Sequence, residues 1–377
     1  MTEIRPFRIS IPESDLDDLR RRIKATRWPY AEPVDDWSQG VPLSYVRDVA
    51  EYWAGDYDWR RAETALNRFP QFVIEIDGVD IHFIHRTSPE ANAFPVIMTH
   101  GWPGSVVEFH KVIEPLVDPV AHGGPAGQAL NLVCPTLPGY GFSGKPTTSG
   151  WGIEKIAEVW AILMDRLGYG RFVAQGGDWG AAVATQIGRN GGACAGIHLN
   201  MPIGAPTKAA RENPTAEDRD ALAAFKYYQD WDSGYSKQQA TRPQTLGYAL
   251  TDSPVGQLAW ILEKFWAWTD CDGHPENALG RDEMLDNVML YWLTGSAASS
   301  ARLYWESFGK NRGKAKVEVP TGVAAFPKEI LRMPRAWCED YYNITHWTKM
   351  DRGGHFAAFE QPEAFTNDVR AFLATIR

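Results

Sequence analysis

The residues best suited to chemistry lie in Gly176-Gly177-Asp178-Trp179-Gly180. An apolar run at 171–174 precedes them, and a helix-like run at 181–187 follows. Small residues two places either side of one functional side chain are typical of a nucleophile elbow, a tight turn between a strand and a helix. Gly176 and Gly180 leave room for a strained turn. The N-terminus of the following helix would direct N–H groups and a positive dipole at the reacting centre.

Asp178 is the side chain that this turn would present. A carboxylate that attacks saturated carbon forms an alkyl ester, so Asp in place of Ser changes the expected chemistry from acyl transfer to epoxides or alkyl halides. A glycine-rich turn with Asp178 as a helix N-cap is the structural alternative. Such a nucleophile needs an oxyanion hole, a base for the second half-reaction and an acid for the leaving oxygen. If the sequence offers candidates for these partners, Asp178 is better interpreted as a nucleophile than as a helix N-cap.

The oxyanion hole is expected at residues 100–105, His-Gly-Trp-Pro-Gly-Ser, which follow directly on an expected strand at 96–99. Glycines on both sides of Trp102 and Pro103 allow the backbone to turn an N–H group inward. We expect the backbone N–H groups of Trp102 and Trp179 to be the two donors. The alternative is an ordinary strand-to-loop turn.

His355 is the candidate base, because it follows the last expected strand and two glycines and can reach the elbow at the carboxyl edge of the sheet. The acid that orients it should follow the preceding strand, which favours Glu329. Asp340 and Asp351 are competitors. Asp340 falls in an expected helix, and Asp351 is too near His355 in sequence to face it easily.

Composition limits the function classes. The 377 residues, with 16 Trp, suffice for one large catalytic unit with an added subdomain. A net charge of −9 argues against nucleic acid or an anionic membrane as partner. Four widely spaced cysteines predict reduced thiols in the cytoplasm. With no signal peptide, membrane span, metal-ligand spacing or nucleotide-binding glycine pattern, we expect a soluble protein without cofactor or metal.

Residues 1–70 are expected to form an N-terminal arm that braces a larger domain. A capping box at Ser14 would start a helix that Pro29 stops after Trp28. A second helix is predicted over 43–57, and the remainder is rich in Trp and Pro.

Residues 71–202 alternate between strand and helix patterns. A hairpin is predicted around Asp77-Gly78, and a helix over 153–167 precedes the elbow strand. Further short apolar strands are expected at 72–76, 79–85, 96–99, 132–135, 171–174 and 197–200. The alternation predicts a mainly parallel sheet with helices on both faces, and the initial hairpin fits the α/β-hydrolase fold.

Residues 203–316 lose the strand pattern after the sixth strand and are predicted to be an inserted helical lid. Its expected aromatic-rich helices cover 216–230, 245–250, 254–269, 281–294 and 296–308. Residues 317–377 are expected to complete the core. They carry strands at 317–325 and 345–350 and a closing amphipathic helix at 363–376.

Several motifs together resemble the microsomal and juvenile-hormone epoxide hydrolases, over essentially the whole chain including the arm. They are Arg5-Pro-Phe, Arg27-Trp-Pro, the segments 100–105 and 176–180, Phe326-Pro-Lys-Glu329 and the segment 352–360. The resemblance implies that Asp178 is the nucleophile, Glu329 the orienting acid and His355 the base. The implied reaction converts a small-molecule epoxide and water into a vicinal diol through a covalent alkyl-Asp ester.

The resemblance also assigns two lid tyrosines that hold the epoxide oxygen, Tyr235 and Tyr304. Residue patterns alone do not select these two among 14 tyrosines, for which core packing is the alternative. Microsomal-type members begin with a membrane anchor, whereas this chain begins at the arm. It therefore resembles the soluble bacterial-type members, without implied membrane association, and a homodimer is carried as a working hypothesis.

Two other functions stay open at this point. A haloalkane or haloacid dehalogenase of the same fold would also use an Asp nucleophile, with Trp179 binding halide. The tyrosine pair and Trp102 argue against it. A catalytically silent binding protein would tolerate loss of the triad, yet all three positions hold competent groups. Lid tryptophans favour a bulky apolar or aromatic epoxide, or equally serve packing: Trp260, Trp266, Trp268, Trp292 and Trp305.

Overall fold

A nine-stranded sheet forms the centre of the computed structural model, which describes residues 3–309 and 315–376. The strand order is β1-β2-β3-β5-β4-β6-β7-β8-β9. The parts of the expected arm, lid and second core segment at 1–2, 310–314 and 377 lie outside the described residues. The strands are β1 (Arg5–Phe7), β2 (Gln71–Ile76), β3 (Val79–Arg86), β4 (Phe94–Thr99), β5 (Leu130–Pro135), β6 (Phe172–Gly176), β7 (Cys194–Leu199), β8 (Val317–Ala325) and β9 (Tyr342–Lys349).

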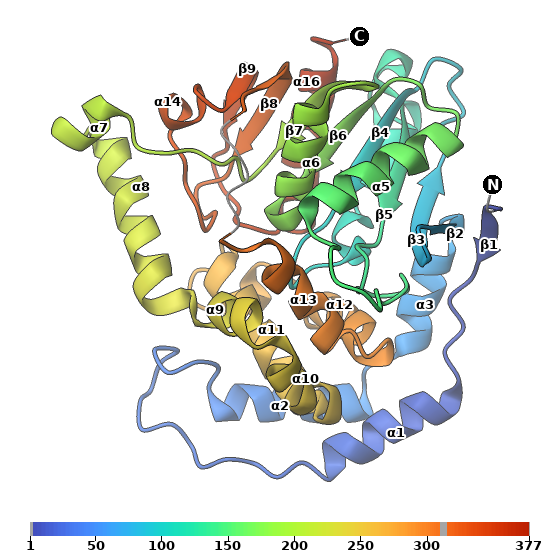
Figure 1. The fold of residues 1–377 in the computed structure, drawn as a ribbon. Helices are drawn as coiled ribbons and strands as arrows, with labels where there is room; N and C mark the ends of the chain where they lie inside the picture. The colour runs from blue at the N-terminus through green and yellow to red at the C-terminus, as the bar shows by residue number, and fades with distance from the viewer. Residues whose placement is uncertain (1–2, 310–314, 377) are drawn as a thin grey trace.

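The predicted mainly parallel sheet is confirmed. β2 and β3 form the expected antiparallel hairpin, with positive φ at Asp77 and Gly78, and β3 pairs antiparallel with β5. From β5 onward each neighbouring pair is parallel. Such a sheet needs apolar cover on both faces. One face carries α5 (Ile153–Arg166) and α6 (Asp178–Asn190), and the other carries α4 (Ile113–Val117) and α16 (Pro362–Leu373) (Figure 1).

The described residues between β7 and β8 form helices joined by loops, and α9 to α13 lie below the sheet in Figure 1. The sequence missed two of these helices, the short α7 and the polar α9. A π-turn (Tyr228–Asp232) joins α8 to α9. The helices are α7 (Lys208–Glu212), α8 (Ala216–Tyr227), α9 (Gly234–Thr241), α10 (Pro243–Asp252), α11 (Pro254–Trp268), α12 (Arg281–Leu293) and α13 (Ala297–Ser307).

Residues 3–70 run beneath these helices and return to the sheet (Figure 1). They form β1, which pairs with β2, and the helices α1 (Glu13–Lys24), α2 (Leu43–Gly55) and α3 (Trp59–Asn67). The sequence missed β1, which is very short, and α3, although Asp58 caps α3 by accepting from the Arg60 N–H.

Two predictions about α1 are wrong. The residue before the helix is Pro12, which has no side chain that can cap, and Ser14 bonds to its neighbour Asp15 instead of forming a capping box. The helix also ends at Lys24 rather than at Trp28. A residue that precedes proline is pushed out of helical geometry, so the chain has to leave the helix before Trp28.

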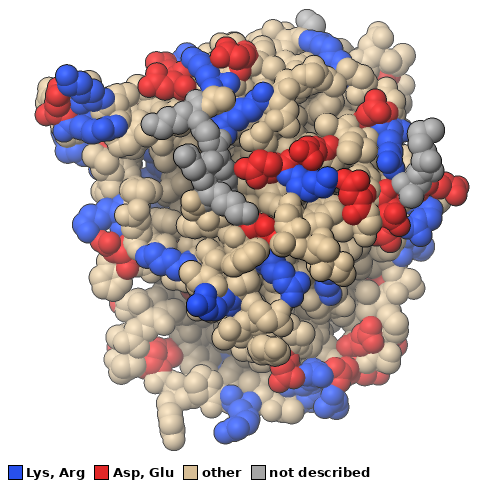
Figure 2. All heavy atoms as spheres, viewed as in Figure 1, with Lys and Arg blue, Asp and Glu red and all other residues tan. Residues whose placement is uncertain are grey.

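Shorter elements connect these layers. Two short helices follow the last strands, α14 (Arg335–Cys338) and α15 (Ala357–Glu360), and a 3-10 helix (Val106–Phe109) follows β4. No helix in the described ranges combines the length and apolarity required to cross a membrane. On the face drawn in Figure 2, acidic and basic side chains are interspersed.

Candidate active site

Asp178 lies at the turn between β6 and α6 with a positive φ of 49°, a conformation that is strained for a residue other than glycine. The flanking glycines make the turn sterically feasible. A Cβ on Gly180 would stand 1.9 Å from the Thr99 carbonyl oxygen, and one on Gly176 would stand 2.2 Å from the Gly180 backbone. The strained elbow turn predicted from the sequence is therefore present.

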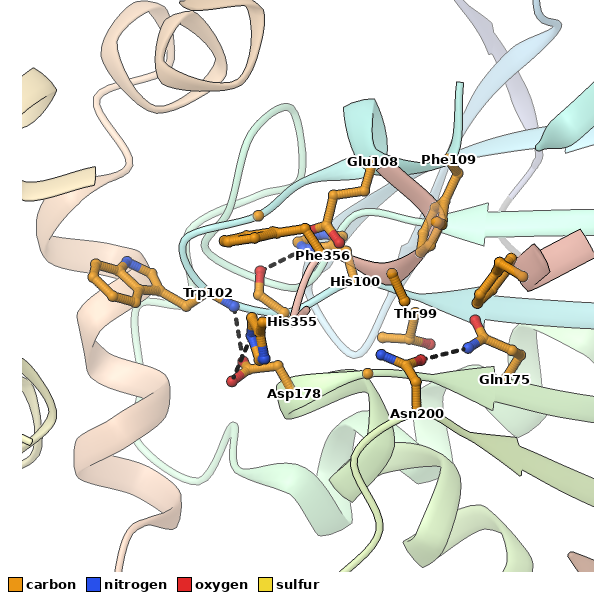
Figure 3. A pocket seen from close by; sticks show the side chains of 16 residues that line it. Thr99, His100, Trp102, Glu108, Phe109, Gln175, Asp178, Asn200, His355 and Phe356 are labelled. Atoms are coloured by element: carbon orange, nitrogen blue, oxygen red, sulfur yellow. Dashed lines mark hydrogen bonds and ion pairs between the residues drawn. The ribbon is translucent and has the colours of Figure 1, made fainter. Parts of the chain in front are cut away.

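The loop after β4 directs a donor at Asp178, as expected. The Trp102 backbone N–H donates to Asp178 Oδ1 at 2.9 Å (Figure 3). Gly101 permits this approach, because a Cβ there would lie 2.3 Å from the Asp178 side chain. The Trp179 backbone N–H also bonds to the carboxylate, and both donors act to lower the pKa of Asp178.

His355 lies between the two carboxylates that the sequence predicted for it. Its Nε2 is 3.6 Å from Asp178 Oδ2, and its Nδ1 is 2.6 Å from Glu329 Oε1. The competing acids, Asp340 and Asp351, are exposed to solvent. The structure thus brings Asp178, His355 and Glu329 together.

Burial and charge set the protonation of this group. Burial raises the pKa of Asp178 above its usual value, against the opposing effects of His355 and of the two backbone N–H groups. For His355, burial lowers the pKa, but the carboxylates of Glu329 and Asp178 outweigh burial and raise the pKa to about 9. At neutral pH the pair is therefore a carboxylate facing an imidazolium.

Both lid tyrosines pack against the two tryptophans whose backbone N–H groups bond to Asp178. The Tyr235 ring stacks on Trp102, with ring centroids 4.9 Å apart, and Tyr304 meets Trp179 edge-on at 4.7 Å. The two tyrosine rings are 5.8 Å apart, and both residues are buried. Burial raises the pKa of each phenol well above its usual value, so both stay protonated donors.

The Tyr304 hydroxyl has no hydrogen-bond partner among the described residues, whereas the Tyr235 hydroxyl lies 3.4 Å from that of Tyr228. A buried hydroxyl without a partner is rare in a folded protein and marks a site that a ligand oxygen can satisfy.

Comparison with known proteins agrees with this geometry. Residues 4–109 match the family model "Epoxide hydrolase N terminus", and residues 95–251 match the model "alpha/beta hydrolase fold". The chain is 53% identical over 376 residues to a Stigmatella aurantiaca protein named "Putative epoxide hydrolase", covering 99% of this chain and 86% of that protein. It is 38% identical over 406 residues to epoxide hydrolase 1 of Sus scrofa, covering 99% of this chain and 89% of that protein. The chain belongs to the epoxide hydrolase family.

A solved structure extends the likeness to three dimensions. The juvenile hormone epoxide hydrolase of the silkworm Bombyx mori superimposes with a TM-score of 0.92 at 33% identity, covering 100% of this chain and 95% of that one. The resemblance and the α/β-hydrolase fold predicted from the sequence are thus confirmed. Epoxide hydrolases act on small-molecule epoxides with water. Within the part of this family member that the structure describes, no group of three or more His, Cys, Asp or Glu side chains could hold a metal ion.

Residues 100–105, which carry the Trp102 donor, form the oxyanion loop of this epoxide hydrolase family member. The sequence did not predict the lid residues that support this loop. Asn287 on α12 donates to the Pro103 carbonyl at 2.7 Å and accepts from Ser105 Oγ at 2.7 Å. Tyr291, one turn later, donates to the Gly104 carbonyl. These partners are more than 180 residues apart, so no local signal points to them.

Two buried carboxyl groups beside the site were also missed. Glu108 lines the pocket beside Asp178 and His355 (Figure 3), and burial raises its pKa to about 8. Glu360 accepts three backbone N–H bonds, including those of Gly354 and Phe356 on either side of His355. The only feature of the sequence that could have pointed to Glu360 is its place in the segment 352–360, which also contains His355.

Proposed function

We propose that this epoxide hydrolase family member opens an epoxide through a covalent ester on Asp178 and releases a vicinal diol. The observation that supports this most strongly is the Asp178 carboxylate, held by the Trp102 N–H on one side and by His355 on the other. The strained elbow holds the carboxylate near enough to both lid tyrosines for its charge to add to burial in raising their pKa values. A carboxylate held in this way is suited to attack saturated carbon.

In the first half-reaction an Asp178 oxygen forms a bond to a ring carbon, and the carbon–oxygen bond of the epoxide breaks. The electron pair moves to the epoxide oxygen, which receives hydrogen bonds and then a proton from Tyr235 or Tyr304. The imidazolium of His355 returns a proton to the resulting phenolate, which leaves His355 neutral for the second half-reaction. Both phenols are buried beside Trp102 and Trp179, so they donate in a water-poor environment where hydrogen bonds are strong.

In the second half-reaction His355 takes a proton from water, which attacks the ester carbonyl. The backbone N–H groups of Trp102 and Trp179 stabilise the resulting oxyanion. Glu329 stabilises the imidazolium that forms, through the 2.6 Å bond to Nδ1. Collapse of the intermediate releases the diol and leaves one water oxygen in the Asp178 carboxylate.

Isotope labelling tests this mechanism. After repeated turnover in heavy-oxygen water, mass spectrometry of the peptide containing Asp178 should show label in the carboxylate, since water attacks the ester carbonyl. Label that enters the diol but never the protein would overturn the covalent mechanism. A parallel assay with chlorinated alkanes should show no chloride release, and efficient release would favour the dehalogenase alternative.

The proposal extends to substrate and organisation. Of the lid tryptophans, Trp268 lies at the site, edge-on to His355, whereas Trp266 stacks on Trp37 of the arm. We assign a bulky apolar epoxide on that basis, and a panel of epoxides assayed for diol formation tests it.

We divide the chain into an arm (1–70), two core segments (71–202 and 317–377) and a lid (203–316). Limited proteolysis with intact-mass analysis tests these boundaries.

We further propose a cytoplasmic setting, which four free, buried cysteines support.

A homodimer is proposed through α8 and the turn that follows it, where Phe225, Tyr227 and Trp231 are exposed. Light scattering of the full chain, compared with a Trp231→Ser variant, tests this association.

A further inference from the structure

A buried lysine lies against the ring of one lid tyrosine. Lys264 is on α11, and only 4% of its side chain is exposed. Its Nζ stands 4.6 Å from the centroid of the Tyr235 ring and 5.1 Å from that of Trp268. An ammonium group at this distance from a ring face is attracted by the ring's electrons.

Two carboxylates keep the ammonium in this position. Lys264 Nζ is 2.8 Å from Asp232 Oδ1 and 2.7 Å from Glu263 Oε2. The other oxygen of Asp232 accepts from Trp268 Nε1 at 2.6 Å. The cation is therefore fixed between a carboxylate and two aromatic rings, one of which belongs to Tyr235.

A buried ion pair of this kind is costly to form, and apolar residues of similar size often serve stability equally well. Its position suggests a chemical use. A positive charge over a phenol ring favours electron density that moves onto the ring and its oxygen. The hydroxyl becomes a stronger hydrogen-bond donor as negative charge develops on an acceptor beside it.

We propose that Lys264 is a positioning residue that strengthens Tyr235 as the donor to the epoxide oxygen during ring opening. This inference rests on the proposed function, since it assigns Tyr235 to the first half-reaction. Lys264 itself does not touch the substrate. Its effect should appear in alkylation of Asp178 and not in hydrolysis of the ester.

The test measures the two half-reactions separately by rapid quench and intact-protein mass spectrometry, with styrene oxide as probe. Lys264→Met keeps the side-chain length without the charge and should slow alkylation about tenfold, which lies between the values for an exposed and for a fully desolvated cation–π contact. Hydrolysis of the ester should change less than about twofold. Lys264→Arg, which keeps the charge, should recover most of the alkylation rate.

Two further variants distinguish an effect of the Lys264 charge on alkylation from a general loss of structure. Lys264→Met leaves the buried Asp232 carboxylate without its cation, so Lys264→Met/Asp232→Asn removes both charges of that pair and leaves only the more exposed Glu263 carboxylate. This double variant should show the same alkylation defect with a cooperative thermal unfolding transition. Lys237→Met, which removes an exposed lysine two residues from Tyr235, is the matched control and should alkylate normally.

A double-mutant cycle with Tyr235→Phe tests whether Lys264 acts through the Tyr235 hydroxyl. If Lys264 acts through the Tyr235 hydroxyl, Lys264→Met should slow alkylation no further once that hydroxyl is gone. Additive losses, equal slowing of both half-reactions, or a normal alkylation rate in the folded Lys264→Met/Asp232→Asn variant would each overturn the inference. Absence of any Asp178 adduct in the wild type would instead contradict the proposed function itself.

Discussion

The protonation of His355 follows from the charge of the residue it faces. Glu329 and Asp178 together outweigh burial and raise its pKa to about 9. An imidazolium cannot accept a proton from water, so His355 cannot be the base while Asp178 is ionised. Once Asp178 becomes a neutral ester, one of the two causes disappears and the pKa of His355 falls. Formation of the intermediate thus converts His355 into the base that removes it.

Replacing His355 should separate the half-reactions. His355→Gln removes the base but leaves Asp178, its backbone donors and the tyrosines in place. Ester hydrolysis should slow by about 10²–10⁴-fold, the usual contribution of a general base, while alkylation continues. Intact-protein mass spectrometry should show an adduct of the substrate's mass. A steady-state rate equal to that of the wild type would exclude His355 as the base.

Removing the lid hydroxyls should affect only ring opening. Tyr304 is the stronger test, because its buried hydroxyl has no partner among the described residues. Tyr304→Phe should slow alkylation roughly a hundredfold, by analogy with the loss of about 3 kcal/mol when an oxyanion donor is deleted. Hydrolysis of the preformed ester should stay nearly intact. Tyr235→Phe should act in the same direction, and normal alkylation in the double variant would mean that the oxygen is held elsewhere.

At the scale of elements, the elbow depends on how closely α6 approaches β4. Gly180 lies in α6, and a Cβ there would stand 1.9 Å from the Thr99 carbonyl. Gly180→Ala should therefore lower the free energy of unfolding by about 1–3 kcal/mol, the range for overpacking. Urea denaturation measures this. Gly55→Ala is the matched control, since the last residue of α2 has open space around it and Ala is favoured in helices. Equal effects of the two variants would contradict the steric argument.

Elements with strong local patterns were predictable from the sequence. The hairpin around Asp77-Gly78, β8 and the helices α11 and α13 follow from turn chemistry and hydrophobic spacing. Elements with weak patterns were not. The three-residue β1 depends on pairing with β2, and the polar α9 forms because its Tyr235 side packs on Trp102 and Trp268.

The same distinction applies to the site. Asp178, Trp102 and His355 belong to short motifs whose chemistry can be read locally, whereas Asn287 and Lys264 act through partners brought together only by the fold. The choice of Glu329 over Asp340 and Asp351 came from its position after a strand, and the 2.6 Å bond to His355 agrees with it.

At the scale of the whole molecule, the arm is joined to the lid by a repeated polar contact. Tyrosines 45, 52 and 57 of the arm donate to the carboxylates of Glu276, Asp282 and Asp286, with distances of 3.0, 2.7 and 2.7 Å. Asp286 also pairs with Arg61, and burial raises the pKa of Asp286 to about 6. The bonds to Asp282 and Asp286 join the arm to α12, the helix whose Asn287 and Tyr291 bond to the loop after β4.

Breaking the most buried of these contacts should loosen the lid. Tyr57→Phe leaves the Asp286 carboxylate with one donor fewer, so the protein should lose about 1–3 kcal/mol of stability. Differential scanning calorimetry measures the loss. The exposed Tyr30→Phe is the matched control and should leave the transition unchanged. No shift in Tyr57→Phe would show that the hydrogen bond contributes nothing to stability.

The two half-reactions should respond differently to pH. Alkylation requires ionised Asp178, whose pKa is raised by burial, so alkylation is lost only as the pH falls through that value on the acidic side. Hydrolysis requires neutral His355. In the ester its pKa lies below about 9, because Asp178 no longer contributes charge while Glu329 still does. As the pH falls through the pKa of His355 in the ester, hydrolysis should therefore slow, and the wild-type ester should accumulate in mildly acidic solution where Asp178 of the free enzyme is still ionised.

Rapid-quench mass spectrometry at about pH 6 and about pH 9 measures this, since a base must be deprotonated to act. We expect a larger steady-state fraction of adduct at the lower pH. Glu329→Gln removes the carboxylate bonded to Nδ1, which should lower the pKa of His355 and move the acidic limb of hydrolysis to lower pH. The maximal rate should fall because the imidazolium loses this partner. An adduct fraction that does not change with pH would mean that His355 does not titrate between the two half-reactions. The base would then have to be another group at the site.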